Sequence, residues 1–146
     1  MAITTNAIAN SFKKELLEAK HNFTQTSGDQ FKIALYTNSA TLGKSTTSFT
    51  TGHQVSNTGQ YTSGGGKLAK GSQQTSVASS VAIVDFADRS FTGVTLTARG
   101  ALIYNTSNSN TAVAVLDFGG DKTATAGTFT IQFPAFTTSA AILRIS

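Results

Sequence analysis

Hydrophobic residues near the start of the chain recur at the spacing of an α-helix. Successive spacings of four, four and three residues place Ile8, Phe12, Leu16 and Ala19 on one face. Either Thr5 or Asn6 is a suitable N-cap, because its side-chain oxygen can accept an unpaired backbone N–H. The pattern therefore predicts a helix over residues 6–20.

A helix of this length is marginal in isolation, so its apolar face must pack against another surface. Two surfaces are open: the sheet of the same domain, or a neighbouring subunit to which the helix would act as a tether. We expect residues 1–23 to form an N-terminal helical segment and residues 24–146 to form a single β domain.

The rest of the chain carries the two-residue alternation of β-strands. Phe31, Ile33 and Leu35 alternate with more polar positions and predict a half-buried strand over residues 31–37. Further strands are expected at 81–86, 94–98, 101–104, 112–118, 129–133 and 141–145.

Turn residues separate these strands. The polar cluster 105–110 predicts a hairpin, Gly119-Gly120-Asp121 predicts another reversal, and Pro134 ends a strand because it lacks an N–H. Gly100 lies at an expected bend and marks a bulge or a close backbone approach. This succession predicts a mainly β fold, an antiparallel β-sandwich or a jelly-roll-like barrel, with a short N-terminal α-helix.

Residues 38–75 form a long excursion rich in Thr, Ser and Gly, with short strands expected near 49–51 and 67–69. Long segments of this kind in a compact domain are often functional, so we expect this one to extend over the sheet and to contact a partner. Together with the helix it supplies the candidate partner-contact residues, which are Ile8, Phe12, Leu16, Phe49, His53 and Tyr61.

Composition supports β structure and restricts the chemistry. Thr occurs 24 times and Ser 16 times in 146 residues, whereas charged residues make up only 12%, and Thr is favoured in strands. Cysteine is absent, which excludes disulfides and thiolate chemistry.

The net charge of +4 is scattered, so we expect no nucleic-acid partner. With no apolar run of membrane-spanning length and no signal-peptide pattern, we expect no membrane partner and folding in the cytosol.

No catalytic motif stands out. His21 and His53 have no carboxylate or serine at a spacing typical of a triad, and we expect both at the surface. The acidic groups Asp85 with Asp88 and Asp117 with Asp121 lack the ligand order of an EF-hand, so we expect them to cap turns and to pair with basic residues. We expect no enzyme activity, no metal and no cofactor; a hydrolase, a lectin-like protein and a nucleic-acid binder are the weaker alternatives.

Five segments together resemble a group of small proteins encoded in the structural modules of tailed bacteriophages. They are SFKKELL (11–17), FKIALYT (31–37), TARGALIYN (97–105), AVLDFGGDKT (114–123) and GTFTIQFP (127–134). The resemblance covers most of the chain but carries no catalytic or binding residue.

The resemblance implies a virion component, in the first place a capsid decoration (cement) protein that clamps neighbouring major capsid subunits from the capsid surface, after assembly in the host cytoplasm. The implied partner is the major capsid protein, with self-association, as a trimer, also expected. The alternative within the same class is a tail, baseplate or fibre-associated protein that contacts the host surface.

Overall fold

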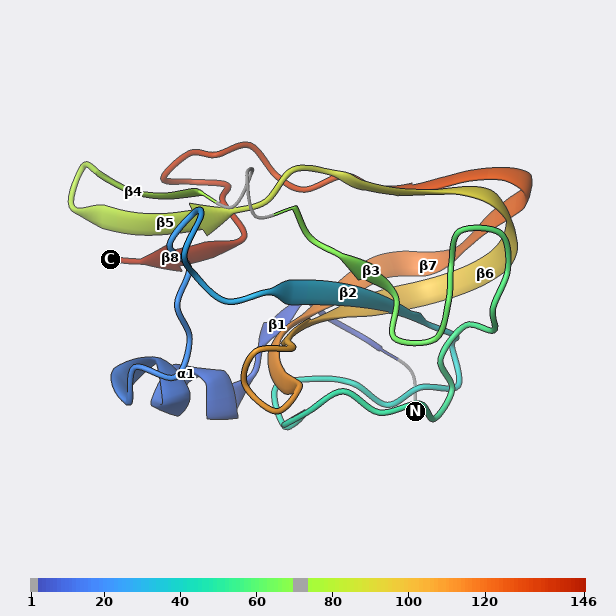
Figure 1. Cartoon of the computed structure of the whole chain (residues 1–146), viewed down its shortest axis with the longest axis horizontal. Coiled ribbons are helices and arrows are strands. Elements are labelled where there is room, and N and C mark those ends of the chain that lie inside the picture. The colour runs from blue at the N-terminus through green and yellow to red at the C-terminus, as the bar shows by residue number, and fades with distance from the viewer. Residues whose placement is uncertain (1–2, 70–73) are drawn as a thin grey trace.

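Two antiparallel β-sheets and one short helix make up the computed structural model, which describes residues 3–69 and 74–146 (Figure 1). Strand accounts for 46% of the chain. The elements are β1 (Ala7–Ile8), α1 (Asn10–Leu17), β2 (Phe31–Tyr36), β3 (Gly66–Lys67), β4 (Gln74–Ala78), β5 (Val81–Asp85), β6 (Arg89–Asn105), β7 (Thr111–Ile131) and β8 (Leu143–Ile145). The large sheet has the order β1-β7-β6-β2-β3 and the small sheet has the order β4-β5-β8. The sheets are not closed into a barrel. The mainly β prediction is therefore confirmed.

A long hairpin, β6 and β7, forms the centre of the large sheet. Its strands have 17 and 21 residues and pair from Arg89 opposite Ile131 to Asn105 opposite Thr111. The predicted hairpin turn after Asn105 is confirmed. The ribbon curves strongly, so that its half near the turn lies beside β2 while its other half runs back in a second layer (Figure 1).

β-bulges accompany this curvature. Residues 118–121 of β7 all lie opposite residue 99, because Gly100 pairs with Asp117 and Ala98 pairs with Lys122. Gly119 within this bulge has a φ of 79°, which glycine adopts without steric cost. The predicted reversal at 119–121 is therefore wrong: the chain bends there but continues as one strand. The separate strands expected at 112–118 and 129–133 merge into β7, and those at 94–98 and 101–104 merge into β6.

The N-terminal helix is shorter than expected. It begins at Asn10, and its N-cap is Ala9, which makes no side-chain capping bond. Residues Ala7 and Ile8 instead form β1, paired with Val115 and Ala114 at the edge of β7. The predicted helix start at residue 6 is wrong because backbone pairing with this strand edge competes with the first helical turn.

Asn6 and the helix both contact the large sheet. The side-chain oxygen of Asn6 accepts the backbone N–H of Asp117 at 2.6 Å, so Asn6 extends the edge contact rather than capping a helix. Phe12 of α1 is 3% exposed and belongs to the main core, and α1 contacts β7. Of the two surfaces considered for the helix, this structure uses the sheet of the same chain.

Strand β2 is buried on both faces, not half-buried as its alternation predicted. Ala34 and Tyr36 are fully buried, as are Ile33 and Leu35 on the other face. Part of the following segment folds over the strand: Val55 donates its N–H to the Leu35 carbonyl at 2.9 Å. A few hydrophobic residues in this mostly polar segment are enough to cover the second face of β2. The alternation within β2 does not reveal that cover, so it predicted a half-buried strand.

Aromatic rings join the two sheets and the helix in one core. Phe23 and Phe31 stack with their centroids 4.5 Å apart, and Phe86, which follows β5, packs beside Phe31 at 5.8 Å. Phe12 approaches the edge of Phe23 at 6.0 Å. Leu143 of β8 belongs to the same cluster, so the small sheet shares the core of the large one.

Hydroxyl groups pair across the exposed face of the curved ribbon. Thr97 and Thr123 lie 2.9 Å apart, oxygen to oxygen, and Ser90 and Thr130 lie 2.8 Å apart. Such cross-strand pairs add a small stabilisation to each rung. This places part of the chain's abundant Thr on the outside of its longest strands.

We expect Gly100→Ala to destabilise the fold, because a Cβ at residue 100 would lie 2.5 Å from the Leu116 carbonyl oxygen and 2.6 Å from Ile3 Cδ1. Forced overpacking of this kind costs about 1–3 kcal/mol. The free energy of unfolding from urea titration measures the effect.

Gly120→Ala is the matched control, since a Cβ there meets no atom within 4 Å. Equal unfolding free energies for the two variants would contradict the close approach at Gly100.

Candidate functional site: the groove between the two sheets

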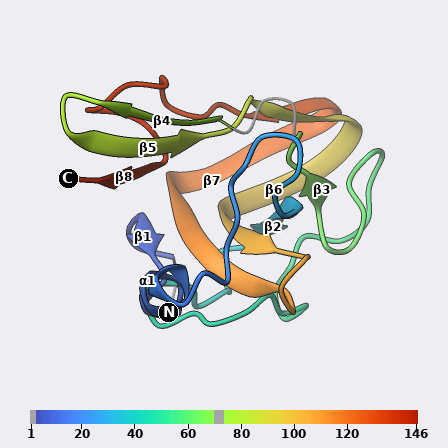
Figure 2. The same ribbon diagram turned by 60° about the vertical axis from the view of Figure 1, so that its left-hand side comes forward.

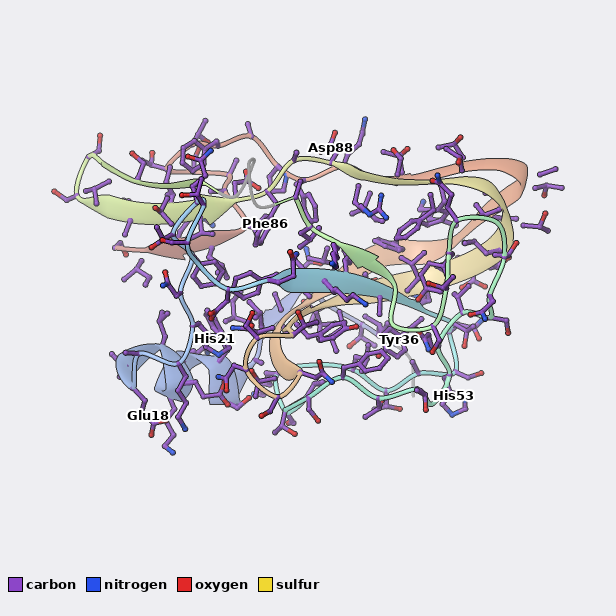
Figure 3. The ribbon with its side chains drawn as sticks, viewed as in Figure 1. Glu18, His21, Tyr36, His53, Phe86 and Asp88 are labelled. Carbon is purple, nitrogen blue, oxygen red and sulfur yellow. The ribbon has the colours of Figure 1, made fainter. Side chains whose placement is uncertain are left out.

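His21 lies in the interior, which corrects the expectation of a surface histidine. It is 7% exposed, and its ring packs between Phe12 and Phe31 at centroid distances of 4.7 and 6.5 Å. Figure 3 shows it directed into the body, whereas Glu18 at the end of α1 points to solvent. His21 was misjudged because its isolated position after a helix gives no sign of the aromatic residues that cover it.

The polar partners of His21 determine which of its ring nitrogens donates a hydrogen bond and which accepts one. Asn105 Oδ1 accepts the Ser107 N–H, so Asn105 Nδ2 is the donor that lies 3.0 Å from His21 Nδ1. His21 Nδ1 must then accept, and the proton on Nε2 is donated to Glu15 Oε2 at 2.7 Å. Asn105 Nδ2 also donates to Asp29 Oδ2 at 2.7 Å. This network connects α1, the segment after it and the end of β6, which is a structural role.

Two further carboxylates make structural contacts along the β6–β7 hairpin. Asp117 on β7 accepts the Gly119 N–H and forms a salt bridge with Arg99 on β6, so the pKa of Asp117 is lowered, first by the Gly119 hydrogen bond. Asp88 accepts the Phe133 N–H at 2.8 Å. The expected pairing with a basic residue is confirmed for Asp117, whereas no salt bridge within the described residues includes Asp85, Asp88 or Asp121.

Asp85 is a buried carboxylate at the end of β5. It is 4% exposed, and its Oδ1 accepts the Phe86 N–H at 2.9 Å. Burial raises the pKa of Asp85, and the negative charge of Asp88 raises it further.

Over residues 3–69 and 74–146, no three His, Cys, Asp or Glu side chains gather closely enough to hold a metal ion. In the same residues no helix has the length and hydrophobicity needed to span a membrane.

The Thr- and Gly-rich excursion is attached to the body along much of its described length, residues 38–69. The Tyr61 hydroxyl accepts the Leu35 N–H at 2.8 Å, and the Tyr36 hydroxyl donates to the Thr50 carbonyl at 2.7 Å. Both rings are fully buried, and burial raises the pKa of Tyr36 to about 12. The strand expected near 67–69 is β3, whereas 49–51 forms no strand; Ser48 makes an isolated bridge to Thr111. Residues 70–73 of the excursion lie outside the described residues.

The six candidate contact residues differ in accessibility. Phe12 and Tyr61 are buried in this chain and offer no surface to a partner. Ile8, Leu16 and Phe49 are partly buried against the core. His53 is exposed at the end of the molecule opposite α1 (Figure 3). The structure does not bring these residues together into one surface.

A groove of about 410 Å³ instead separates the edges of the two sheets. Figure 2 shows that β1 and β8, which both contribute lining residues, lie on the same side of β7. The terminal strand of each sheet contributes to the groove: β1 through Ala7 and Ile8, and β8 through Arg144. The partly buried hydrophobic residues of its lining are Ile8, Leu116, Phe118, Phe133 and Ile142. Of the six candidate residues, only Ile8 is among the described residues that line it.

A second, wider hollow of about 960 Å³ lies between residues 4–8 and the excursion at 41–50. Thr and Ser side chains with Lys13 and Lys44 make up much of its lining. We favour the groove between the sheets as the candidate site because it combines apolar side chains with the edges of two sheets.

Comparison of the chain with protein-family models, with curated protein sequences and with solved structures found no significant match.

We expect Tyr61→Phe to lower the free energy of unfolding by about 1–3 kcal/mol, because it leaves the buried Leu35 N–H without an acceptor. Tyr36→Phe is the control: it removes a donor from the carbonyl of Thr50, an exposed residue that water can reach. Urea titration measures both, and an equal or smaller loss for Tyr61→Phe would show that the excursion is not held through this bond.

The opposite pKa shifts of Asp85 and Asp117 predict opposite effects of pH on the stability of the fold. Because the folded-state pKa of Asp85 is raised, its stabilising contribution is present below the ordinary pKa of 3.8 and is lost as pH rises through the folded value. Asp85→Asn should therefore unfold at a higher temperature than the wild type at pH 7, and this gain should shrink toward pH 4.

Asp117→Asn should behave in the opposite way. Its lowered pKa means that the contribution of Asp117 is present at pH 7 and is lost as pH falls. Thermal unfolding provides the measurement, at pH 7 and pH 4 for Asp85→Asn and at pH 7 and about pH 2.5 for Asp117→Asn, because the contribution of Asp117 is lost only below its ordinary pKa of 3.8. A pH-independent difference for either variant would refute its assignment.

Proposed function

We propose that this chain is a structural component of a tailed-bacteriophage particle, and within that class a capsid decoration protein that binds neighbouring major capsid subunits on the capsid surface. The role proposed is binding, with no catalytic step. Self-association, as a trimer at a threefold position, is part of the proposal.

The segments that carry the resemblance to phage structural proteins coincide with the body of the fold. Residues 11–17 correspond to α1, 31–37 to β2, and 97–105 to the half of β6 near the turn. Residues 114–123 and 127–134 cover most of β7 and the segment after it. The similarity therefore concerns the parts that build the large sheet and its helix.

The observation that carries the proposal is the open groove between the sheet edges. Apolar surface beside strand edges suits the binding of another chain. Several ionisable groups are engaged instead in structural contacts: His21 and Glu15 with each other, Asp117 with Arg99, and Asp88 with a backbone N–H. We propose further that the two sheets form a sandwich that is open on this side.

The size of the molecule allows a clamping role. Its accessible surface is 7196 Å², and a stable protein interface covers about 800 Å² on each partner. The surface therefore has room for contacts with more than one neighbour, as a clamp between capsid subunits requires.

Locating the chain in purified particles tests the proposal. Quantitative mass spectrometry of particles that encode this sequence should give a copy number comparable to that of the major capsid protein, and electron cryomicroscopy should place it on the capsid exterior. A few copies at the tail would support the tail or baseplate alternative, and absence from the particle would refute a virion role.

A further inference from the structure

Each sheet ends in an edge strand at the groove. β1 is the outermost strand of the large sheet and β8 that of the small sheet, and both contribute to the lining. In the part of the chain that the structure describes, no strand pairs with the outer side of either one. Edge strands present backbone N–H and C=O groups that another strand can pair with. The occupant that best satisfies such edges is an extended polypeptide.

The floor of the groove is suited to side chains of that polypeptide. Leu116 and Phe118 of β7, with Phe133 and Ile142, are only partly buried within this chain. Alternate residues of an extended segment point to the same side, so apolar residues at every second position would cover this floor. The volume of about 410 Å³ is near the lower end of the usual range of roughly 300–1,000 Å³ for binding pockets. It admits a few side chains rather than a folded element.

The charged residues of the groove place a further requirement on its occupant. Arg144 on β8 is exposed, its guanidinium makes a long 3.4 Å bond to the Thr138 carbonyl, and none of the salt bridges within the described residues includes it. Asp117, also in the lining, is already paired with Arg99. The groove therefore carries one uncompensated positive charge, which favours a carboxylate on the occupant.

We propose that the groove receives an extended segment of a neighbouring capsid subunit, which adds a strand to the outer edge of β8, with apolar residues at alternate positions and an Asp or Glu facing Arg144. This inference rests on the function proposed above and specifies the contact. The occupant is a foreign segment rather than a second copy, because the alternating segments of this chain that the structure describes are already paired within its own sheets. A second copy would have to release one of them.

Hydrogen–deuterium exchange tests the contact on the full chain, free and bound to particles. Backbone amides of residues 114–118 and 140–145 should exchange more slowly in the bound chain. Arg144→Glu should weaken binding to particles that lack the chain by about tenfold or more, since a like charge would then face the partner's carboxylate.

Lys122→Glu is the matched control, because it makes the same charge change at an exposed position of β7 outside the groove lining. It should bind particles like the wild type, and thermal unfolding should show that both variants are folded.

The outcomes separate this inference from the proposed function. Bound chain with slowed exchange only on other surfaces, or equal loss of binding in the two variants, would overturn the strand addition while leaving the capsid role intact. Slowed exchange of the groove in isolated chain as its concentration rises would identify a second copy as the occupant and would also overturn it. Absence of the wild-type chain from particles would remove the proposed function itself, and with it the capsid segment as the occupant.

Discussion

The pairing of β6 with β7 is the constraint on which the other elements depend. Between Arg89 and Asn105, β6 follows β7 through four register shifts, and the ribbon contributes to both layers of the molecule. β2 pairs with β6, β1 pairs with β7, and α1 packs against β7, so the position of each follows from this hairpin. The bulge at residues 118–121 is part of that curvature. A β-bulge bends the strand that contains it and increases its twist, so this bulge contributes to the bend of β7.

Local patterns predicted the elements whose backbone contacts are close in sequence, together with the clearest strands. Alternation located β2 and β5, and the polar cluster after Asn105 located the hairpin turn. Gly119-Gly120 was read as a reversal because glycine pairs mark turns and bulges alike; only the partner strand distinguishes them. Helical spacing likewise extended α1 backward over Ala7 and Ile8, since two residues of strand pairing leave no periodic signal. The groove could not be predicted, because it requires knowing which strands end the sheets.

The excursion after β2 illustrates a limit of reading exposure from composition. Its Thr, Ser and Gly residues indicated a segment that extends over the sheet and contacts a partner, yet Tyr61 and Val55 lie in the core and cover β2. The same holds for the N-terminal region, where Phe12 and His21 pack against Phe23 or Phe31. Both regions that supplied the candidate partner-contact residues are thus packed against the body of the chain. The features accessible to a partner include the strand edges and the partly buried apolar residues between them, which line the groove.

The hydroxyl pairs along the exposed face of β6 and β7 have a consequence for salinity. Neutral hydrogen bonds such as Thr97 to Thr123 are not weakened by dissolved ions in the way that exposed ion pairs are, because they involve no net charge to screen. With charged residues at only 12% of the sequence, little of the folding free energy rests on surface electrostatics. The hydroxyl-rich face of β6 and β7 should therefore keep its structure from low to high salt concentration.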